Sequence, residues 1–208
     1  MKSIKNWFRN KNLPSVEPCF SKTRNKQVFK FILVAFVIWQ LALIAFIALG
    51  NRVIPTSNQY VYTEKQIINP SWLWSRANFD GTHYLDIARK GYGIYQQAFF
   101  PLYPNLIKFL TPFFNGQSLL AGWTINLVSF FLSLWFFYQL VKMDFKEKIA
   151  KRSLLYLLIF PTAFFFSMIY TEALFFFFIL ASFYFAKTKK WWWAGIFGCL
   201  ASATRLVG

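Results

Sequence analysis

The sequence predicts an all-α polytopic membrane protein with a long first external loop, and its composition, apolar runs and charge placement all indicate this class. Hydrophobic residues make up 57% of the 208 residues and 28 residues are Phe, whereas charged residues make up only 14%. An ordinary soluble domain has roughly 25% charged residues. Two apolar runs, Phe31–Leu49 and Ser118–Val141, are close to the ~20 residues that a helix needs to cross the hydrocarbon core.

The basic residues are clustered beside the apolar runs. The net charge of +16 would suggest a nucleic-acid partner in a soluble protein. Here eight Lys or Arg lie in residues 1–30, five in Lys142–Arg152 and three in Lys187–Lys190. This is the distribution that the positive-inside rule describes. We therefore expect these three segments to be cytoplasmic, and we expect no nucleic-acid partner.

Residues 1–30 form a basic tail that precedes the first apolar run. A tail and an apolar run of these lengths exceed those of a cleaved signal peptide, which indicates a retained signal anchor with a first span at residues 31–49. Trp7, Phe8 and the lysines of the tail suit contact with membrane lipids. The two cysteines do not suggest a disulfide framework, because Cys19 lies in the basic tail and Cys199 lies in a late hydrophobic segment.

The remaining spans are expected at residues 118–141, 153–169, 173–186 and 191–208, with an external loop over residues 50–117. Leu154–Ala186 would be about 50 Å long as a single helix, and both of its ends are basic, so it needs two passes. The expected break is Tyr170–Glu172, and Pro161 is expected to kink the first arm. The last span meets no polar stop before Gly208, so we expect it to be cut within a longer polytopic protein.

The external loop contains two segments that we expect to lie at the membrane surface. Residues 99–114 are interrupted by three prolines and by Lys108, which favours a surface-lying or re-entrant segment over a span. Residues 80–90 predict a short amphipathic helix with Asp80 as the N-cap and Gly91 as the C-terminal glycine. One of its faces would carry Tyr84, Leu85 and Ala88.

Three charged residues from separate segments are all predicted on the outer side: Asp80, Glu172 and Arg205. Ionisable groups near membrane depth indicate function, because they are costly there. The alternative is that they are unrelated, with Asp80 a helix cap and Glu172 a polar turn. Asp80, His83 and Asp86 would make a poor metal site, because their i, i+3, i+6 spacing leaves one helical face, so we expect no metal.

Three motifs carry a resemblance to a known family. They are Phe79-Asp80-Gly81-Thr82-His83-Tyr84-Leu85-Asp86-Ile87-Ala88-Arg89-Lys90-Gly91-Tyr92 with Phe99-Phe100-Pro101-Leu102-Tyr103-Pro104, then Phe160-Pro161-Thr162-Ala163 through Tyr170-Thr171-Glu172, and last Ala201-Ser202-Ala203-Thr204-Arg205. Together they resemble the PIG-V-like mannosyltransferases and their prokaryotic relatives, over about residues 72–208. Members of that family are longer, so the chain is expected to hold the N-terminal part.

The resemblance implies a GT-C glycosyltransferase fold, a transmembrane helical bundle with interfacial helices in the first external loop. It also implies a polyprenyl-phosphate sugar donor. Eukaryotic relatives add mannose to a glycosylphosphatidylinositol precursor in the endoplasmic reticulum. Prokaryotic relatives lack that lipid, so the acceptor stays open as a lipid or a glycan. We expect a multi-pass protein of a prokaryotic plasma membrane that uses no cofactor.

The chemistry of this transfer suits the residues that the motifs contain. A base must take the proton of the acceptor hydroxyl, and Asp80 is the candidate. Arg205 can stabilise the departing phosphate. The expected substrate-binding residues are His83, Tyr84, Asp86, Tyr103, Glu172 and Arg205. Two alternatives remain: a non-enzymatic transporter or structural subunit, and a related transferase for another sugar, such as a protein mannosyltransferase or an aminoarabinose transferase.

Overall fold

The computed structural model describes residues 22–54 and 71–205, and every regular element in these two ranges is helical. The predicted all-α class is therefore confirmed for this part of the chain. Three expectations lie outside the described residues: the basic tail up to residue 21, with Trp7, Phe8 and Cys19; the loop segment 55–70; and the end of the last expected span, residues 206–208.

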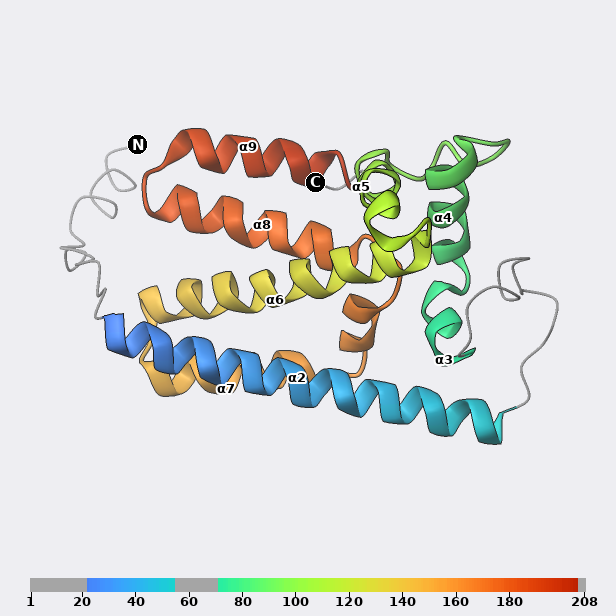
Figure 1. Cartoon of the computed structure of the whole chain (residues 1–208). Coiled ribbons are helices and arrows are strands. Elements are labelled where there is room, and N and C mark those ends of the chain that lie inside the picture. Colours follow the sequence, from blue (N-terminus) through green and yellow to red (C-terminus); the bar gives the residue numbers. More distant parts are fainter. Residues whose placement is uncertain (1–21, 55–70, 206–208) are drawn as a thin grey trace, which may run out of the picture.

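Five helices lie side by side and form a bundle (Figure 1). They are α2 (Lys22–Val53), α6 (Ser118–Asp144), α7 (Glu147–Ile159), α8 (Glu172–Lys187) and α9 (Trp191–Ser202). Helix α6 packs against α8, α7 and α2, and α8 packs against α9. Each helix of this set runs opposite to the one before it along the chain, so that the α6–α7 and α8–α9 connections share one end of the bundle with the start of α2 (Figure 1).

Two helices among the described residues are long and apolar enough to cross a membrane. These are the Asn25–Val53 part of α2, with 29 residues, and α6, with 27 residues. They contain the two apolar runs from which the sequence predicted the first and second spans. Helices α7, α8 and α9 have 13, 16 and 12 residues, or about 18 to 24 Å at 1.5 Å per residue. The assignment of these three helices as spans stays a prediction.

The segment expected as one span at residues 153–169 is not one continuous helix. Helix α7 ends at Ile159, and Phe160 is extended with ψ 134°. The cause is Pro161, which disfavours helical backbone in the residue before it. A short 3-10 helix, η5 (Ala163–Ser167), follows. Helix α8 then begins at Glu172, within the predicted break, and runs opposite to α7 (Figure 1).

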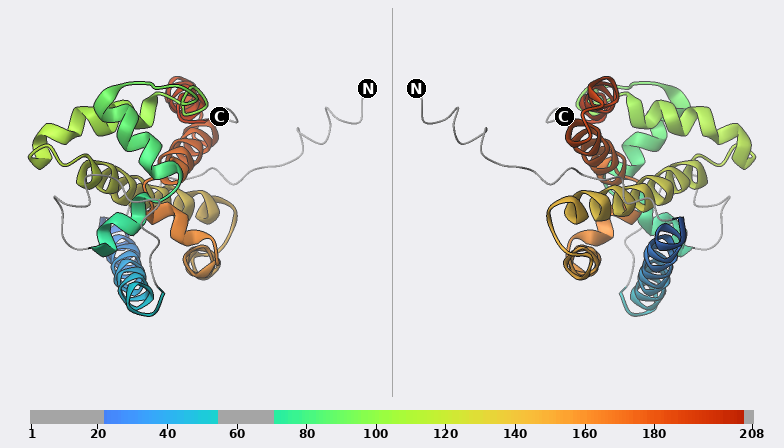
Figure 2. Two further views of the ribbon diagram at one scale, coloured as in Figure 1. Left: turned by 90° about the vertical axis from the view of Figure 1, so that its right-hand side faces the viewer. Right: turned by 90° about the vertical axis from the view of Figure 1, so that its left-hand side faces the viewer.

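The loop segments cover the other end of the bundle, where α2 ends and α6 begins (Figures 1 and 2). They comprise α3 (Ser71–Trp74), η3 (Ser75–Ala77), α4 (Asp80–Lys90), α5 (Leu102–Leu110) and η4 (Thr111–Phe114). Helix α5 is seen end-on in Figure 1 while α6 is seen from the side, so α5 lies across the bundle. The segment 99–114 was predicted to be surface-lying or re-entrant, and its place relative to the membrane stays a prediction.

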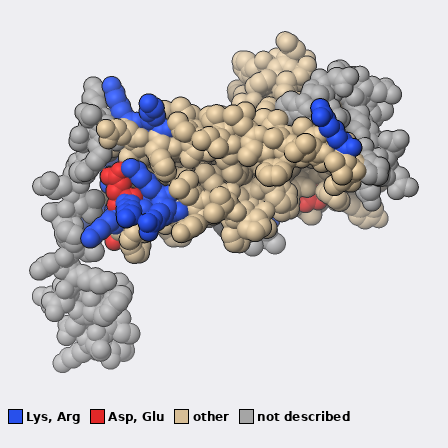
Figure 3. All heavy atoms as spheres, turned by 90° about the horizontal axis from the view of Figure 1, so that it is seen from below, with Lys and Arg blue, Asp and Glu red and all other residues tan. Residues whose placement is uncertain are grey.

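Basic side chains gather at the end of the bundle opposite to these loop segments. On the face shown in Figure 3, most Lys and Arg atoms lie at the left end, where α6 ends and α7 begins. At this end Lys187 of α8 forms an ion pair with Asp144 of α6, and Lys151 pairs with Glu147 at 2.8 Å within α7. The two ends of the bundle therefore differ in charge as the sequence predicted.

The core has two parts. One joins the loop segments to α6, α8 and α9 through buried side chains that include Tyr84, Leu85, Tyr103 and Ile107. The other lies between α2, α6 and α7 and includes Ile32, Phe130, Leu134, Tyr138 and Leu154. The first part packs α4 and α5 against α6 and the start of α8, which is the region that carries Asp80, Tyr84 and Glu172.

Candidate active site

Asp80 opens helix α4, but it is not the N-cap that the sequence predicted. Asp80 is the first residue of the helix, Phe79 precedes it, and no side chain caps the helix end. The carboxylate is thereby left out of a capping bond while it still lies beside the positive end of the helix dipole. The other end agrees with the prediction: Gly91 has φ 83°, and its N–H donates to the carbonyl of Ile87.

Gly81 allows the start of α4 to approach the segment before α8. A Cβ atom at Gly81 would lie 3.2 Å from the carbonyl oxygen of Ile169 and 3.4 Å from the Cβ atom of Ile169. The distance to the carbonyl oxygen is tighter than an ordinary van der Waals contact, so any residue other than glycine would require the neighbouring backbone to shift. The glycine beside Asp80 therefore brings the Asp80 backbone next to the backbone that leads to Glu172.

Glu172 and Arg205 form an ion pair. The Nη1 atom of Arg205 lies 2.9 Å from the Oε1 atom of Glu172, and the side chains are 41% and 31% exposed. The Arg205 guanidinium also lies 5.9 Å from the centre of the Phe175 ring. The Oε2 atom of Glu172 is buried and has no hydrogen-bond partner among the described residues. The pair brings together two of the three charged residues that the sequence predicted on one side.

Arg205 lies beyond the end of α9 and not inside a continuous helix. The expected span 191–208 is helical only to Ser202 in the described part of the chain, and Arg205 follows three residues later with its N–H on the carbonyl of Ala201 at 3.3 Å. A cation next to the C-terminal end of a helix is favoured by the helix dipole. The end of α9 and the start of α8 thus place opposite charges side by side.

The charges of Asp80 and Glu172 both influence the pKa values of two tyrosines, Tyr84 and Tyr170. The pKa of Tyr84 is raised, chiefly by burial. A hydrogen bond with Thr171 and the charge of Arg205 lower this pKa, whereas the charges of Glu172 and Asp80 raise it. Burial raises the pKa of Tyr170 to about 12, with added contributions from Asp80 and Glu172. Both tyrosines are therefore neutral at pH 7. The pKa of Tyr84 responds to all three predicted charged residues, Asp80, Glu172 and Arg205.

Tyr103 lies behind Tyr84 in the core. Its side chain is fully buried, its hydroxyl donates to the carbonyl of Gly122 at 3.3 Å, and its ring meets that of Tyr84 edge to face at 5.2 Å. Burial raises the pKa of Tyr103 well above its usual value. Tyr103 was predicted to bind substrate, but the structure places it where it supports Tyr84 and has no exposed surface of its own.

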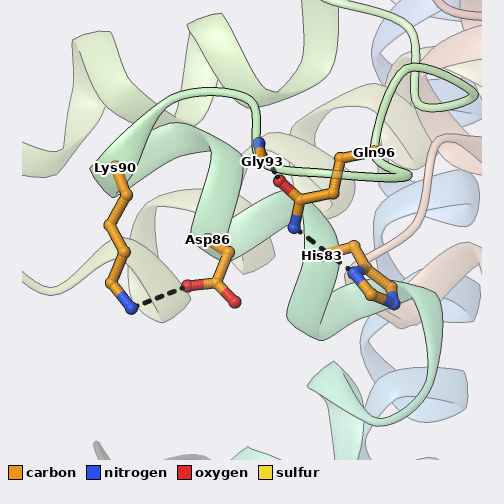
Figure 4. A network of polar contacts seen from close by, with 5 residues as sticks. All are labelled: His83, Asp86, Lys90, Gly93 and Gln96. Carbon is orange, nitrogen blue, oxygen red and sulfur yellow. Dashed lines mark hydrogen bonds and ion pairs between the residues drawn. The ribbon is translucent and has the colours of Figure 1, made fainter.

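His83 and Asp86 have local partners, and Figure 4 shows the polar ones. The His83 ring stacks on Phe99 with centroids 4.9 Å apart, and its Nδ1 atom lies 3.4 Å from Nε2 of Gln96. Asp86 pairs with Lys90 across one helical turn at 3.4 Å. The Gln96 side chain also accepts the N–H of Gly93 at 2.8 Å, so the loop after α4 folds back over His83.

Residues that sequence reasoning missed hold the site together. Asn126 of α6 donates from Nδ2 to the carbonyl of Tyr170 at 3.1 Å and also to that of Met168. Arg76 of η3 is buried and donates to Ser167. Asn126 could have been found, because an amide inside an apolar run indicates a specific partner. Nothing in the sequence around Arg76 distinguishes it from an exposed loop arginine.

The comparison with known protein families identifies the chain. A family profile described as Mannosyltransferase (PIG-V) matches residues 26–207, which is most of the chain and includes every predicted site residue. The chain belongs to the PIG-V mannosyltransferase family. Comparisons with curated proteins and with solved structures found no match. Membership in the PIG-V family supports glycosyltransferase activity, with mannose as the sugar, and the two long apolar helices fit a membrane protein.

Proposed function

We propose that this PIG-V family member transfers mannose from a polyprenyl-phosphate donor to a hydroxyl group of a lipid-linked or glycan acceptor, on the non-cytoplasmic face of the membrane. One observation carries the proposal. Asp80 begins a helix at the same end of the bundle as the Glu172–Arg205 pair, and all three charges act on Tyr84. A carboxylate and a cation in one site are what transfer from a lipid phosphate requires.

In the proposed reaction the acceptor oxygen attacks the anomeric carbon of the donor sugar. The new glycosidic bond forms as the bond between that carbon and the phosphate oxygen breaks, and the electron pair leaves with the polyprenyl phosphate. Asp80 takes the proton of the acceptor hydroxyl as general base. The phosphate is already an activated leaving group, so the proposed step needs no cofactor.

Arg205 is proposed to contact the departing phosphate. One of its nitrogens bonds Glu172, and its side chain is partly exposed. Because a guanidinium carries five N–H donors in a planar fork, it can keep that bond and still donate to phosphate oxygens. Glu172 would then hold the guanidinium in one orientation, which reduces the cost of ordering it when the donor binds.

The proposed orientation in the membrane follows from the two ends of the bundle. In this orientation α2 and α6 cross the membrane, the basic end faces the cytoplasm, and the loop segments that carry Asp80 face the other side. A polyprenyl chain would lie against the apolar surface of the bundle while its phosphate reaches Arg205. A prokaryotic plasma membrane is the proposed location. The PIG-V family match favours this transferase over a transporter or a structural subunit.

The test is a donor comparison with the purified protein in liposomes. Polyprenyl-phosphate-mannose, polyprenyl-phosphate-glucose and a nucleotide-linked mannose are offered in separate reactions with a mixture of lipid and glycan acceptors. The proposal predicts sugar transfer from the first donor only. Transfer from the glucosyl lipid alone would assign another sugar to the same chemistry. Transfer from the nucleotide sugar alone would refute the lipid donor.

A further inference from the structure

A buried arginine joins the loop that carries Asp80 to the rest of the bundle. Arg76 in η3 is 1% exposed, although arginine is almost never fully buried unless it is paired. Its Nη1 atom donates to the carbonyl oxygen of Ser167 at 3.2 Å and to the Ser167 hydroxyl. Its guanidinium lies 4.9 Å from the centre of the Trp123 ring of α6. Among the described residues, its Nε and Nη2 atoms have no hydrogen-bond partner.

The contacts of Arg76 extend to α2. The Ser167 hydroxyl, which accepts from Arg76, donates to Oε1 of Gln40 at 3.0 Å. Gln40 is the one polar residue of the first apolar run, and it is buried. A chain of polar contacts therefore crosses the apolar interior from η3 through η5 to α2. Groups of this kind are costly to bury, and inside a membrane protein they indicate function.

Two further hydrogen bonds join the segment after Arg76 to the segment after Ser167. The N–H of Ile169 donates to the carbonyl of Arg76 at 2.8 Å, and the Tyr170 hydroxyl donates to the carbonyl of Asn78 at 3.0 Å. Asp80 lies two residues after Asn78, and Glu172 lies two residues after Tyr170. These bonds therefore fix the position of Asp80 relative to Glu172, and the bonds of Arg76 to Ser167 are the first of the set along the chain.

Phe79, which lies between these hydrogen bonds and Asp80, has an unfavourable backbone conformation. Phe79 has φ 54° and ψ −124°, a combination that non-glycine residues seldom adopt. Such conformations persist only where the surrounding structure determines them, and they occur often at active sites. Here the bonds of Arg76 and Asn78 hold the chain on one side of Phe79, and the contact of Gly81 with Ile169 holds it on the other.

We propose that Arg76 is a positioning residue of the transfer reaction, which through Ser167 holds the Asp80 segment in the orientation that lets the carboxylate reach the acceptor beside Glu172. This inference rests on the proposed function. Arginine suits the task because its Nη1 atom bonds both the carbonyl and the hydroxyl of Ser167 while its planar guanidinium lies over the Trp123 ring, and the compact ammonium of lysine does not reproduce this combination. Burial lowers the pKa of Arg76 to about 10, so the guanidinium remains charged at pH 7.

The experiment compares Arg76→Lys and Ser167→Ala in the full chain, in liposomes. Matched controls are Arg152→Lys at the basic end and Ser182→Ala. The Ser182 hydroxyl in α8 donates to the carbonyl of Ala194 in α9 at 2.9 Å. We measure kcat and KM for polyprenyl-phosphate-mannose per folded molecule. We expect kcat to fall about 10²-fold in Arg76→Lys and about tenfold in Ser167→Ala, with KM within about threefold, since misplacement of a reacting group by 1 Å has effects of this size.

Hydrogen exchange of the Ile169 amide gives a readout that does not depend on activity. This amide donates to Arg76, so it should exchange about tenfold faster in Ser167→Ala and in Arg76→Lys, and unchanged in both controls. If Arg76→Lys does not fold, Ser167→Ala decides. Unchanged exchange with unchanged kcat would overturn the proposal, and so would a rise in KM alone, which would make Arg76 a binding residue.

The outcome for Arg76 is separable from that for the base. Normal turnover by Asp80→Asn, combined with faster Ile169 exchange and lower kcat in Ser167→Ala, would refute the proposed base and leave the positioning role in place for another group of the site. Loss of folded protein with kcat per folded molecule unchanged would show a structural role only and would overturn the positioning role.

Discussion

At the level of single residues, the proposed chemistry depends on Asp80 and on the Glu172–Arg205 pair. The two residues lie 33 positions apart in the sequence, and the end of α9 and the start of α8 bring them to 2.9 Å. Neither residue was predicted to pair with the other. The interpretation of Arg205 as a phosphate contact therefore has to include its partner, because Glu172 offsets part of the positive charge.

Substitution of Arg205 should separate charge from geometry. Arg205→Lys keeps the positive charge and can keep the ion pair with Glu172, but it loses the planar fork. We expect a moderate loss of kcat/KM for the lipid donor in Arg205→Lys and a larger loss in Arg205→Ala, of roughly 10²-fold or more. Steady-state kinetics with purified variants would test this. Equal activity of the alanine variant and the wild type would exclude Arg205 from donor use.

The residue-level predictions differ in how far the sequence could support them. Asp80 and Glu172 could be selected because acidic residues in an apolar chain are few and costly. Arg76 could not, since its burial results from bonds to Ser167, which is 91 positions away. Tyr103 was selected from the motif, and only the packing of α4 against α5 and α6 shows that it lies behind the site.

At the level of elements, local signals determined some boundaries and tertiary contacts determined others. Helix α4 ends where Gly91 predicted, because a residue with φ 83° ends a helix whatever surrounds it. The break before Glu172 was also predicted, from segment length and flanking charge. The end of α7 at Ile159 was not predicted, because Pro161 was interpreted as a kink and in fact ends the helix. The end of α9 at Ser202 has no proline or glycine beside it to indicate it.

The contact between α4 and the segment before α8 can be tested at Gly81. Gly81→Ala places a methyl group 3.2 Å from the Ile169 carbonyl, so the start of α4 must shift. We expect a loss of about 1–3 kcal/mol in the free energy of unfolding, as for other overpacked sites, and lower transfer activity. The control is Gly195→Ala in α9, where a Cβ atom meets nothing within 4 Å. A melting temperature of Gly81→Ala equal to that of the control would contradict the close approach.

At the level of the whole molecule, the two ends of the bundle are distinct. The described Lys and Arg clusters of the α6–α7 and α8–α9 connections share one end, and α4, α5 and the site share the other (Figures 1 and 3). The positive-inside rule predicts that the basic end faces the cytoplasm, and this orientation stays a prediction. Two helices meet the length and hydropathy of a span, and the passes of α7, α8 and α9 stay predictions.

Cysteine labelling of intact cells tests this orientation. Single cysteines replace Tyr95, which is 91% exposed in the loop after α4, and Lys146, which is exposed between α6 and α7. Cys19 and Cys199 are removed in both variants. We expect a membrane-impermeant thiol reagent to label the cysteine at position 95 and to label the one at position 146 only after the membrane is opened. Equal labelling of both in intact cells would contradict the topology.

The central claim is that Asp80 is the general base, and the most direct measurement is the transfer rate of Asp80→Asn with polyprenyl-phosphate-mannose in liposomes. Because Asp80 makes no capping bond, the substitution removes basicity at little structural cost. The control is Asp144→Asn, which changes the same chemical group at the basic end of the bundle. We predict a loss of roughly 10²–10⁴-fold in kcat for Asp80→Asn at an unchanged yield of folded protein, and near-normal kcat for the control. Near-normal turnover by Asp80→Asn would contradict the account and would leave Asp80 as the first residue of a surface helix.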